Sequence, residues 1–324
     1  MYPILKTVRK VPGGLMIIPL LLGVITNTLF PEFLEWGGFI TPVWKTGAMT
    51  LIGIFLFCSG SQIQIKQAGL PLVKGVLLTT TELIVGIGIG LGVHAFFGPA
   101  GILGITPLAL IAGISNSNGG LYASLAGQFG DSSDSGALSV LSINDGPFFA
   151  LVALGASGIA DISWKLIVAA VLPIVVGCIL GNLDNNIRTF LEPGELLVIP
   201  FFSFPLGAGL SIQNLLKAGG PGILLGVVSC LSTGLAGYGI MKLIKSKHPQ
   251  VGAAIGNTAG NAAAVPLAIA AADATFEAAE KSATIQVAAA VIVTAIMCPL
   301  LVTFLDKYEK KKQAEREAKA ARTA

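Results

Sequence analysis

The stretch Ile114-Ser-Asn-Ser-Asn-Gly-Gly-Leu-Tyr122 decides the fold, because it places polar side chains inside one of the most apolar regions of the chain. Apolar sequence runs up to it from Gly101 and away from it through Leu125. Hydrogen-bonding side chains are expensive inside a bilayer, and a glycine pair weakens a helix. The stretch therefore predicts a helix broken at membrane depth. Such a break is tolerated only where it lines a wet cavity walled by protein.

The second half of the chain has a counterpart, Gly256-Asn-Thr-Ala-Gly-Asn-Ala-Ala-Ala-Val-Pro266. It contains the same ingredients: two asparagines, glycines, a hydroxyl and then a helix breaker. Interrupted apolar segments in corresponding positions of two halves are the best sequence indication of a transporter site.

The composition of the chain indicates a membrane protein. Of its 324 residues 53% are hydrophobic and only 11% are charged, whereas soluble domains carry about 25% charged residues. We expect a single membrane transport domain over residues 1–324. The four cysteines stand singly in apolar runs, so no metal site, disulfide framework or cofactor is expected. The expected partners are the lipid bilayer and a small molecule, with no nucleic acid.

About 20 apolar residues cross a bilayer, and this length gives ten candidate transmembrane helices in an all-α chain. They cover residues 12–30, 46–63, 75–97, 102–127, 137–160, 165–182, 196–213, 221–241, 251–272 and 282–304. A charged tail follows at 306–324.

The placement of basic residues predicts the orientation of the chain. Ten spans put both termini on one side, and the segments on that side carry 16 of the lysines and arginines, against 4 on the other. Because basic residues collect on the cytoplasmic side, both termini are predicted to be cytoplasmic.

An internal repeat relates the two halves. Four residues recur at an offset of 150 residues; they are Ser61, Ala68, Gly69 and Pro71, matched by Ser211, Ala218, Gly219 and Pro221. The two asparagine-rich stretches match at an offset of 143. Repeats over about 12–160 and 165–304 would each hold five spans, so they predict a five-plus-five inverted repeat. The alternative is chance similarity between stretches rich in glycine, alanine and leucine.

The polar residues of the two broken segments are the candidate substrate site. They are Asn116, Ser117, Asn118, Gly119, Gly120, Tyr122, Asn257, Thr258 and Asn261. The N-terminus of a half-helix carries partial positive charge and unpaired N–H groups, which suit an anionic substrate such as a carboxylate. The alternative is that these asparagines only join helices through hydrogen bonds.

Other polar residues within the spans are candidates for proton or ion coupling. Asn144 and Asp145 precede a Gly-Pro break in the fifth span, Glu82 lies in the third, and Gln286 starts the tenth. A desolvated carboxyl has a raised pKa and can carry a proton. The alternatives are a helix-capping role for Asp145 and a buried pairing for Glu82.

The chain contains no nucleotide-binding, hydrolase or zinc-protease motif, so an intramembrane enzyme is poorly supported. A channel is a further alternative, but no filter-like sequence is present.

Six stretches of the chain, in order along nearly its whole length, resemble the bacterial 2-keto-3-deoxygluconate permeases. They are Val11–Met16, Asn118–Ser124, Gly181–Asp184, Ile199–Phe204, Ala259–Asn261 and Ala289–Thr294. The resemblance implies an inner-membrane, proton-coupled importer of that sugar acid. It also implies a fold similar to that of the bile acid:sodium symporters, with a panel domain, a core domain and two crossing broken helices. The crossing helices would be the fourth and ninth spans, centred on residues 116–120 and 257–261.

One position departs from the resemblance and bears on the coupling ion. The family often has Glu-Ser before the Gly-Pro of the fifth span, whereas this chain has Asn144-Asp145, which moves the acid by about 100° around a helix. We expect proton coupling with Asp145 as the carrier. The alternative is a sodium-coupled symporter of another small organic anion, with oxygens of Asn116, Ser117, Asn144 and Gln286 around the ion.

Overall fold

The computed structural model describes residues 2–8, 14–64, 69–144, 146–210 and 212–323, and the regular structure in these ranges is helical. The only β-type pairing in this part is an isolated bridge between Ile102 and Ile105. The predicted all-α class is confirmed. Asp145, together with Ala68 and Ser211 of the proposed repeat, lies outside the described residues.

A first group of helices consists of two closely packed pairs. Helix α2 (Gly14–Leu29) packs on α14 (Ile199–Ala208), and α4 (Ala48–Gln62) packs on α11 (Trp164–Leu183). Helix α14 also contacts α4, which joins the pairs. Short helices connect these elements; they are η1 (Pro31–Glu35), α3 (Ile40–Trp44), α12 (Asn185–Leu191) and α13 (Gly194–Leu197). A further short helix, α1 (Ile4–Val8), precedes α2.

Glycines allow both pairs to approach closely. A Cβ added at Gly207 would clash with the backbone oxygen of Leu20 on α2, and one at Gly23 with that of Phe204 on α14. In the second pair, a Cβ at Gly177 would clash with the backbone oxygen of Phe57. Close backbone contact through small residues is how helices pack in membranes, where lipid removes the hydrophobic drive between them.

A second group contains the three longest helices. These are α5 (Leu70–Phe97), α15 (Ile212–Leu243) and α17 (Glu277–Thr323), with α15 packed along α17 and in contact with α5. The remaining segments are interrupted and pack against these long helices. The largest cluster of buried apolar side chains joins the two groups, and includes Phe55 and Phe202 of the first and Leu110 and Ala263 of the second.

The chain is interrupted at both asparagine-rich stretches and also in the fifth segment, where the sequence predicts a Gly-Pro break. The fourth segment consists of α6 (Pro107–Ile114) and α7 (Gly119–Phe129). The ninth consists of η3 (Pro249–Ile255), η4 (Gly260–Ala264) and α16 (Val265–Ala272), followed by η5 (Ala274–Phe276). The fifth is divided into α8 (Ser132–Gly136), α9 (Leu138–Leu141), η2 (Ser142–Asn144) and α10 (Phe148–Ala156). Its last break coincides with Gly146, whose φ of +89° favours glycine.

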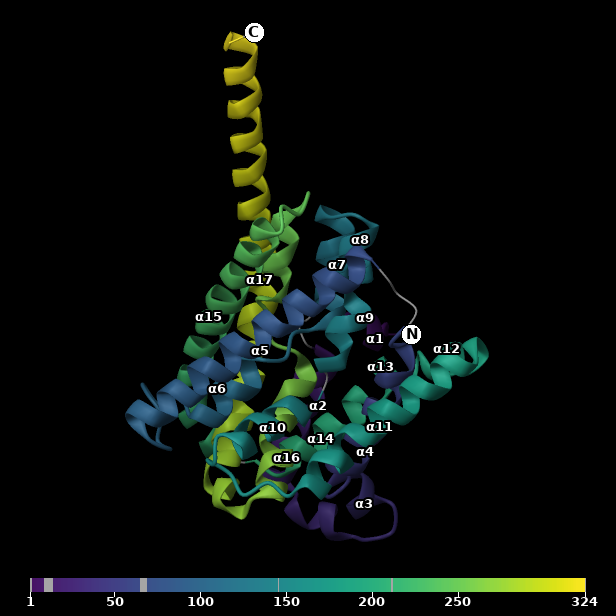
Figure 1. The fold of residues 1–324 in the computed structure, drawn as a ribbon. Helices are drawn as coiled ribbons and strands as arrows, with labels where there is room; N and C mark the ends of the chain where they lie inside the picture. The colour runs from purple at the N-terminus through teal and green to yellow at the C-terminus, as the bar shows by residue number, and fades with distance from the viewer. Residues whose placement is uncertain (1, 9–13, 65–68, 145, 211, 324) are drawn as a thin grey trace.

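The two ends of the molecule differ. Helix α17 continues past the other helices and projects from one end, the tail end, where α7 and α8 also lie; α3 lies at the opposite end (Figure 1). Within the described residues three helices are long and apolar enough to cross a membrane, over 70–97, 219–243 and 274–315. The other helices are shorter, so the count of ten spans stays a prediction.

Adding a methyl group at the closest glycine contacts should destabilise the protein. Gly177→Ala and Gly207→Ala should each lower the free energy of unfolding by about 1–3 kcal/mol, because the new Cβ meets backbone that cannot move aside. Thermal unfolding of the purified protein in detergent measures the effect. Gly88→Ala on α5 is the matched control, since nothing lies within 4 Å of its added Cβ. An unchanged melting temperature for Gly177→Ala and Gly207→Ala would contradict this role of the glycines in packing.

Candidate functional site

The breaks of the fourth and ninth segments touch each other. The backbone N–H of Ala259 donates to the carbonyl of Asn116 over 2.8 Å. The N–H of Asn118 donates to the side-chain oxygen of Asn257 over 2.5 Å. Polar stretches that lie far apart in the sequence thus meet at one point, which we call the crossing.

Two of the predicted site asparagines hold backbone at the crossing. The side-chain oxygen of Asn118 caps α7 by accepting from the N–H of Leu121 over 2.9 Å. The side-chain amide nitrogen of Asn257 donates to the carbonyl of Ala254 over 2.6 Å. Both the oxygen and the nitrogen of the Asn257 amide are therefore hydrogen-bonded to backbone groups. At the start of α7, the N–H groups of Gly119 and Gly120 have no partner within the helix by position.

Hydroxyl groups bond the backbone freed by the two breaks. The Thr258 hydroxyl donates to the carbonyl of Gly113 over 2.7 Å, and that of Ser229 donates to the same carbonyl over 3.3 Å. The N–H of Thr258 donates to the hydroxyl of Thr294 over 2.9 Å. The hydroxyl of Thr233, on α15, donates over 3.3 Å to the carbonyl of Ile255 in the ninth segment.

Sequence reasoning missed Ser229, Thr233 and Thr294. The signal that was available is a pair of hydroxyl residues one turn apart, at 229 and 233, in an apolar helix. All three are fully buried. Since they bond the breaks from α15 and α17, these helices fix the geometry of the crossing.

The side chain of Asn116 differs from its neighbours. It is only 3% exposed, and neither its amide oxygen nor its amide nitrogen has a hydrogen-bond partner within the described residues. Burying an amide without a partner is unfavourable, so such a group is rare in a native structure. A ligand or ion that the amide binds would supply the missing partner.

Two further predicted residues contact the break of the fourth segment. The buried carboxylate of Glu82 on α5 accepts from the Ser117 hydroxyl over 3.0 Å. The side-chain amide nitrogen of Asn144 in the fifth segment donates to the carbonyl of Ser115. A carboxyl group therefore lies directly against the crossing. Asp145, the predicted proton carrier, is next to Asn144 in sequence but outside the described residues.

Gln286 and Tyr122 lie elsewhere. Gln286 holds the start of α6: its amide oxygen accepts from the N–H of Thr106 over 3.2 Å, and its nitrogen donates to the carbonyl of Gly104 over 2.9 Å. The Tyr122 hydroxyl donates to the carbonyl of Asp134 over 3.0 Å, toward the tail end. Both side chains are fully buried.

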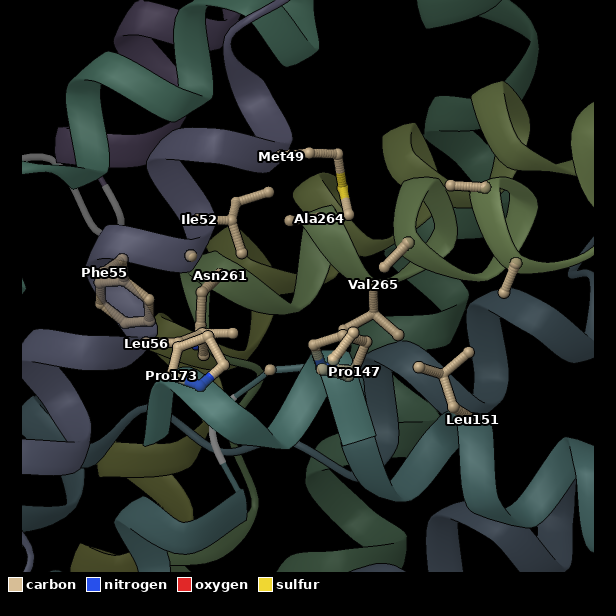
Figure 2. Close-up of a pocket in the computed structure, with 17 residues that line it drawn as sticks. Met49, Ile52, Phe55, Leu56, Pro147, Leu151, Pro173, Asn261, Ala264 and Val265 are labelled. Atoms are coloured by element: carbon tan, nitrogen blue, oxygen red, sulfur yellow. The ribbon is translucent and has the colours of Figure 1, made fainter. Parts of the chain in front are cut away.

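A cavity of about 170 Å³ lies between the two groups of helices. Its walls come from α4 and α11 on one side and from α10, η4 and α16 on the other. Asn261 is the only polar side chain among the described lining residues, and Figure 2 shows it beside Phe55, Leu56 and Pro173. Of the predicted substrate-binding residues, only Asn261 lines this cavity.

The cavity lies toward the end of the molecule that carries α3. It is lined by the first half of α4, which starts directly after α3, and by the part of α16 that leads to the start of α17. The tail end of α17 is at the other end of the molecule (Figure 1).

Comparisons with known proteins agree on one family. The family model described as 2-keto-3-deoxygluconate permease matches residues 5–311. The chain is 53% identical over 224 residues to 2-keto-3-deoxygluconate permease 1 of Salmonella typhimurium, covering 69% of this chain and 71% of the relative. It is 36% identical over 259 residues to the 2-keto-3-deoxygluconate permease of Bacillus subtilis, covering 78% of each chain.

Among solved structures, the fold is similar to that of a sodium proton antiporter from Methanocaldococcus jannaschii. The TM-score is 0.52, with 16% sequence identity and coverage of 90% of this chain and 92% of the other. At this identity the likeness concerns the fold alone.

The hydroxyl of Thr258 should be needed for a stable crossing. Thr258→Val keeps the shape of the side chain but removes one donor from the carbonyl of Gly113, so we expect a loss of about 1–3 kcal/mol in the free energy of unfolding. Thermal unfolding in detergent measures this loss. Thr80→Val, the same substitution on the exposed face of α5, is the control. Equal stability of the two variants would show that the hydrogen bond contributes nothing.

Proposed function

Because the chain belongs to the 2-keto-3-deoxygluconate permease family, we propose that it imports 2-keto-3-deoxygluconate across the cell inner membrane by proton-coupled symport. Family membership identifies a permease, not an enzyme. The observation that carries the proposal is the crossing of two interrupted segments around the buried amide of Asn116, which has no hydrogen-bond partner within the described residues. Interrupted segments that meet inside a membrane protein are typical of secondary transporters.

The substrate site is proposed at the crossing. Its direct contacts are Asn116, Asn261 and the N–H groups of Gly119 and Gly120 at the start of α7. No cationic side chain lies among the described residues that line the cavity or bond at the crossing. The substrate carboxylate is therefore balanced by the N-terminus of α7, where the helix dipole and unpaired N–H groups favour an anion. Four of the other predicted site residues, Ser117, Asn118, Asn257 and Thr258, hold this geometry, whereas Tyr122 bonds toward the tail end.

The two halves are proposed to be inverted repeats that alternate access to the site. The packing partners support this relation, because the contact of the first segment with the seventh corresponds to that of the sixth with the second. In the same way, the contact of α5 with α6 corresponds to that of α15 with η3. With both termini cytoplasmic, the cavity beside Asn261 opens the route to the site from the outer side.

We propose that the carboxyl that carries the coupled proton belongs to either Glu82 or Asp145. Glu82 is buried and accepts a hydrogen bond from Ser117 at the break, so its protonation state bears directly on the crossing. A proton carrier gains and loses a proton during each cycle, and Glu82 lies where that change would act on the break of the fourth segment. Sodium is the competing ion, because the amide oxygen of Asn116 is the type of ligand that a hard cation takes.

Purified protein in sealed vesicles should accumulate 2-keto-3-deoxygluconate unchanged when a pH gradient is imposed, and should ignore a sodium gradient. Labelled substrate and its chemical identity inside the vesicles are measured. A channel would equilibrate the substrate without concentrating it. Accumulation that requires a sodium gradient and does not depend on the pH gradient would refute proton coupling, but it would still show that the protein is a transporter.

Asn116→Ala is the internal control for the site in the same vesicles. It should abolish uptake without lowering the unfolding temperature, because the substitution removes no hydrogen bond that the Asn116 amide makes within the described residues. Uptake at the wild-type rate would remove Asn116 from the site.

Neutralising the coupling carboxyl should separate exchange from accumulation. Glu82→Gln and Asp145→Asn are tested separately, and the variant of the carrier should exchange substrate between equal compartments but lose accumulation driven by the pH gradient. Glu280→Gln, an acid at the start of α17, is the control and should accumulate normally. If both single variants still follow the pH gradient, neither carboxyl is the carrier.

A further inference from the structure

A group of charged and polar side chains lies at the tail end, away from the crossing. We call it the tail-end cluster, and its members are Lys74, Asp131, Ser133, Asp134 and His248. Lys74 belongs to α5, Asp131 is the N-cap of α8, Ser133 and Asp134 lie in α8, and His248 directly precedes η3. The cluster thus lies where the end of the fourth segment meets the start of the ninth.

One part of the cluster is fixed. The Lys74 ammonium lies 2.5 Å from a carboxylate oxygen of Asp134 and 2.8 Å from the Ser133 hydroxyl, and Lys74 and Asp134 are almost fully buried. The other oxygen of Asp134 accepts from the N–H of Asp131 over 3.0 Å. Separating a buried ion pair is costly, so Lys74 and Asp134 hold each other in place.

The same ammonium argues against a metal ion here. The ligand atoms of Asp131, Asp134 and His248 lie within 4.8 Å of one another, which is close enough for a shared cation. However, Lys74 already supplies the positive charge on the Asp134 carboxylate. The group therefore fits an ion-pair cluster better than a metal site.

A second part of the cluster is adjustable. A ring nitrogen of His248 lies 3.9 Å from a carboxylate oxygen of Asp131. Hydrogen bonds from Ser133, with smaller contributions from the Asp134 N–H and Lys74, hold the pKa of Asp131 at about 2 against the opposing effect of burial. Asp131 is therefore ionised at every physiological pH. Histidine is the side-chain type whose charge can change between about pH 5 and 8, and His248 is the histidine of the cluster.

The charges of the cluster indicate which form of His248 favours its contact with Asp131. With His248 neutral, the cluster has two carboxylates and one ammonium; protonation of His248 adds the second positive charge. The neighbouring elements carry pairs that are already made: Lys310 with Asp306 at 2.7 Å on α17, and Lys242 of α15 with Glu309 at 2.6 Å. Lys247 precedes His248 in sequence and is the nearest further charge along the chain.

The contact between His248 and Asp131 bears on both broken segments. Asp131 is the N-cap of α8, two residues after the end of α7. Close by, the side chain of Gln250 in η3 donates to the carbonyl of Phe129 over 3.2 Å and to Asp306 over 3.2 Å. The two segments are thus joined at the tail end as well as at the crossing, and His248 is the histidine of this junction.

We propose that His248 is a positioning residue for transport: when protonated, it pairs with Asp131 and fixes the tail-end junction of the two broken segments. The transport rate then depends on pH at this end, separately from any gradient that drives accumulation. This inference rests on the proposed transport function but not on the choice of coupling ion.

The test is exchange of labelled 2-keto-3-deoxygluconate across proteoliposomes of the full chain, at equal pH on both sides, between about pH 5 and 8. His248→Lys carries a permanent charge and should exchange at the acid-limit rate of the wild type throughout the range. His248→Gln should exchange at the alkaline-limit rate throughout. We expect these rates to differ about two- to fivefold, the effect that one partly exposed ion pair can have.

Two further variants control the result. Asp131→Asn removes the partner and should flatten the pH profile as His248→Gln does. His94→Gln, at the far end of α5, should keep the wild-type profile. Amide hydrogen exchange over residues 248–256 should be slower in His248→Lys than in His248→Gln. This measurement tests whether the junction is fixed, even in a variant whose transport is impaired.

Several outcomes would overturn the inference. Equal rates for His248→Lys and His248→Gln, or a wild-type pH profile in His248→Gln, would show that His248 does not position the segments. Loss of gradient-driven accumulation in His248→Gln with an unchanged exchange profile would make it a coupling residue instead. An absence of exchange in the wild type at every pH would refute the proposed function, which is a separate result.

Discussion

The backbone at the two breaks imposes the main constraint on this structure. A helix interrupted among apolar side chains leaves N–H and C=O groups without their regular partners, and each such group is costly unless another group bonds it. Here the carbonyls of Gly113 and Ile255 are bonded by hydroxyls of α15, and the N–H of Thr258 by a hydroxyl of α17. Helix α15 must therefore stay in register with both breaks, and α17 with the break of the ninth segment. Because these hydrogen bonds connect the long helices to the broken segments, we expect the second group of helices to move together as one rigid body.

The same hydrogen bonds separate residues that build the crossing from residues that are available to a ligand. The amide of Asn257 uses both ends on backbone, and the oxygen of Asn118 caps α7. Asn116 has the same side chain a few residues away and uses neither end within the described residues. Chemical type alone does not distinguish these asparagines; their hydrogen bonds do. The apolar walls beside Asn261 then limit where a polar substrate can find partners.

The sequence predicted the breaks well, because asparagines and a glycine pair rarely occur together within an unbroken apolar helix. It did not predict which hydroxyls bond them. A serine or threonine in an apolar helix commonly bonds the carbonyl four residues before it, as Thr26 and Thr81 do, so Ser229 looks ordinary until its neighbour in space is known. The sequence also did not indicate that Lys74 is buried in an ion pair, since its partner Asp134 lies 60 residues further along the chain. Contacts of this kind depend on the fold, and no periodic pattern in the sequence indicates them.

The pairing of α2 with α14 and of α4 with α11 also has a consequence for biosynthesis. Each pair takes one helix from either half of the chain, and each depends on glycines that need the partner's backbone to close against. A nascent chain that has inserted its first five segments has completed neither pair. During that interval the glycine-lined faces of α2 and α4 are covered by lipid or by the insertion machinery. The first group of helices therefore assembles late, after α14 has left the ribosome, although its first member is among the earliest segments to be made.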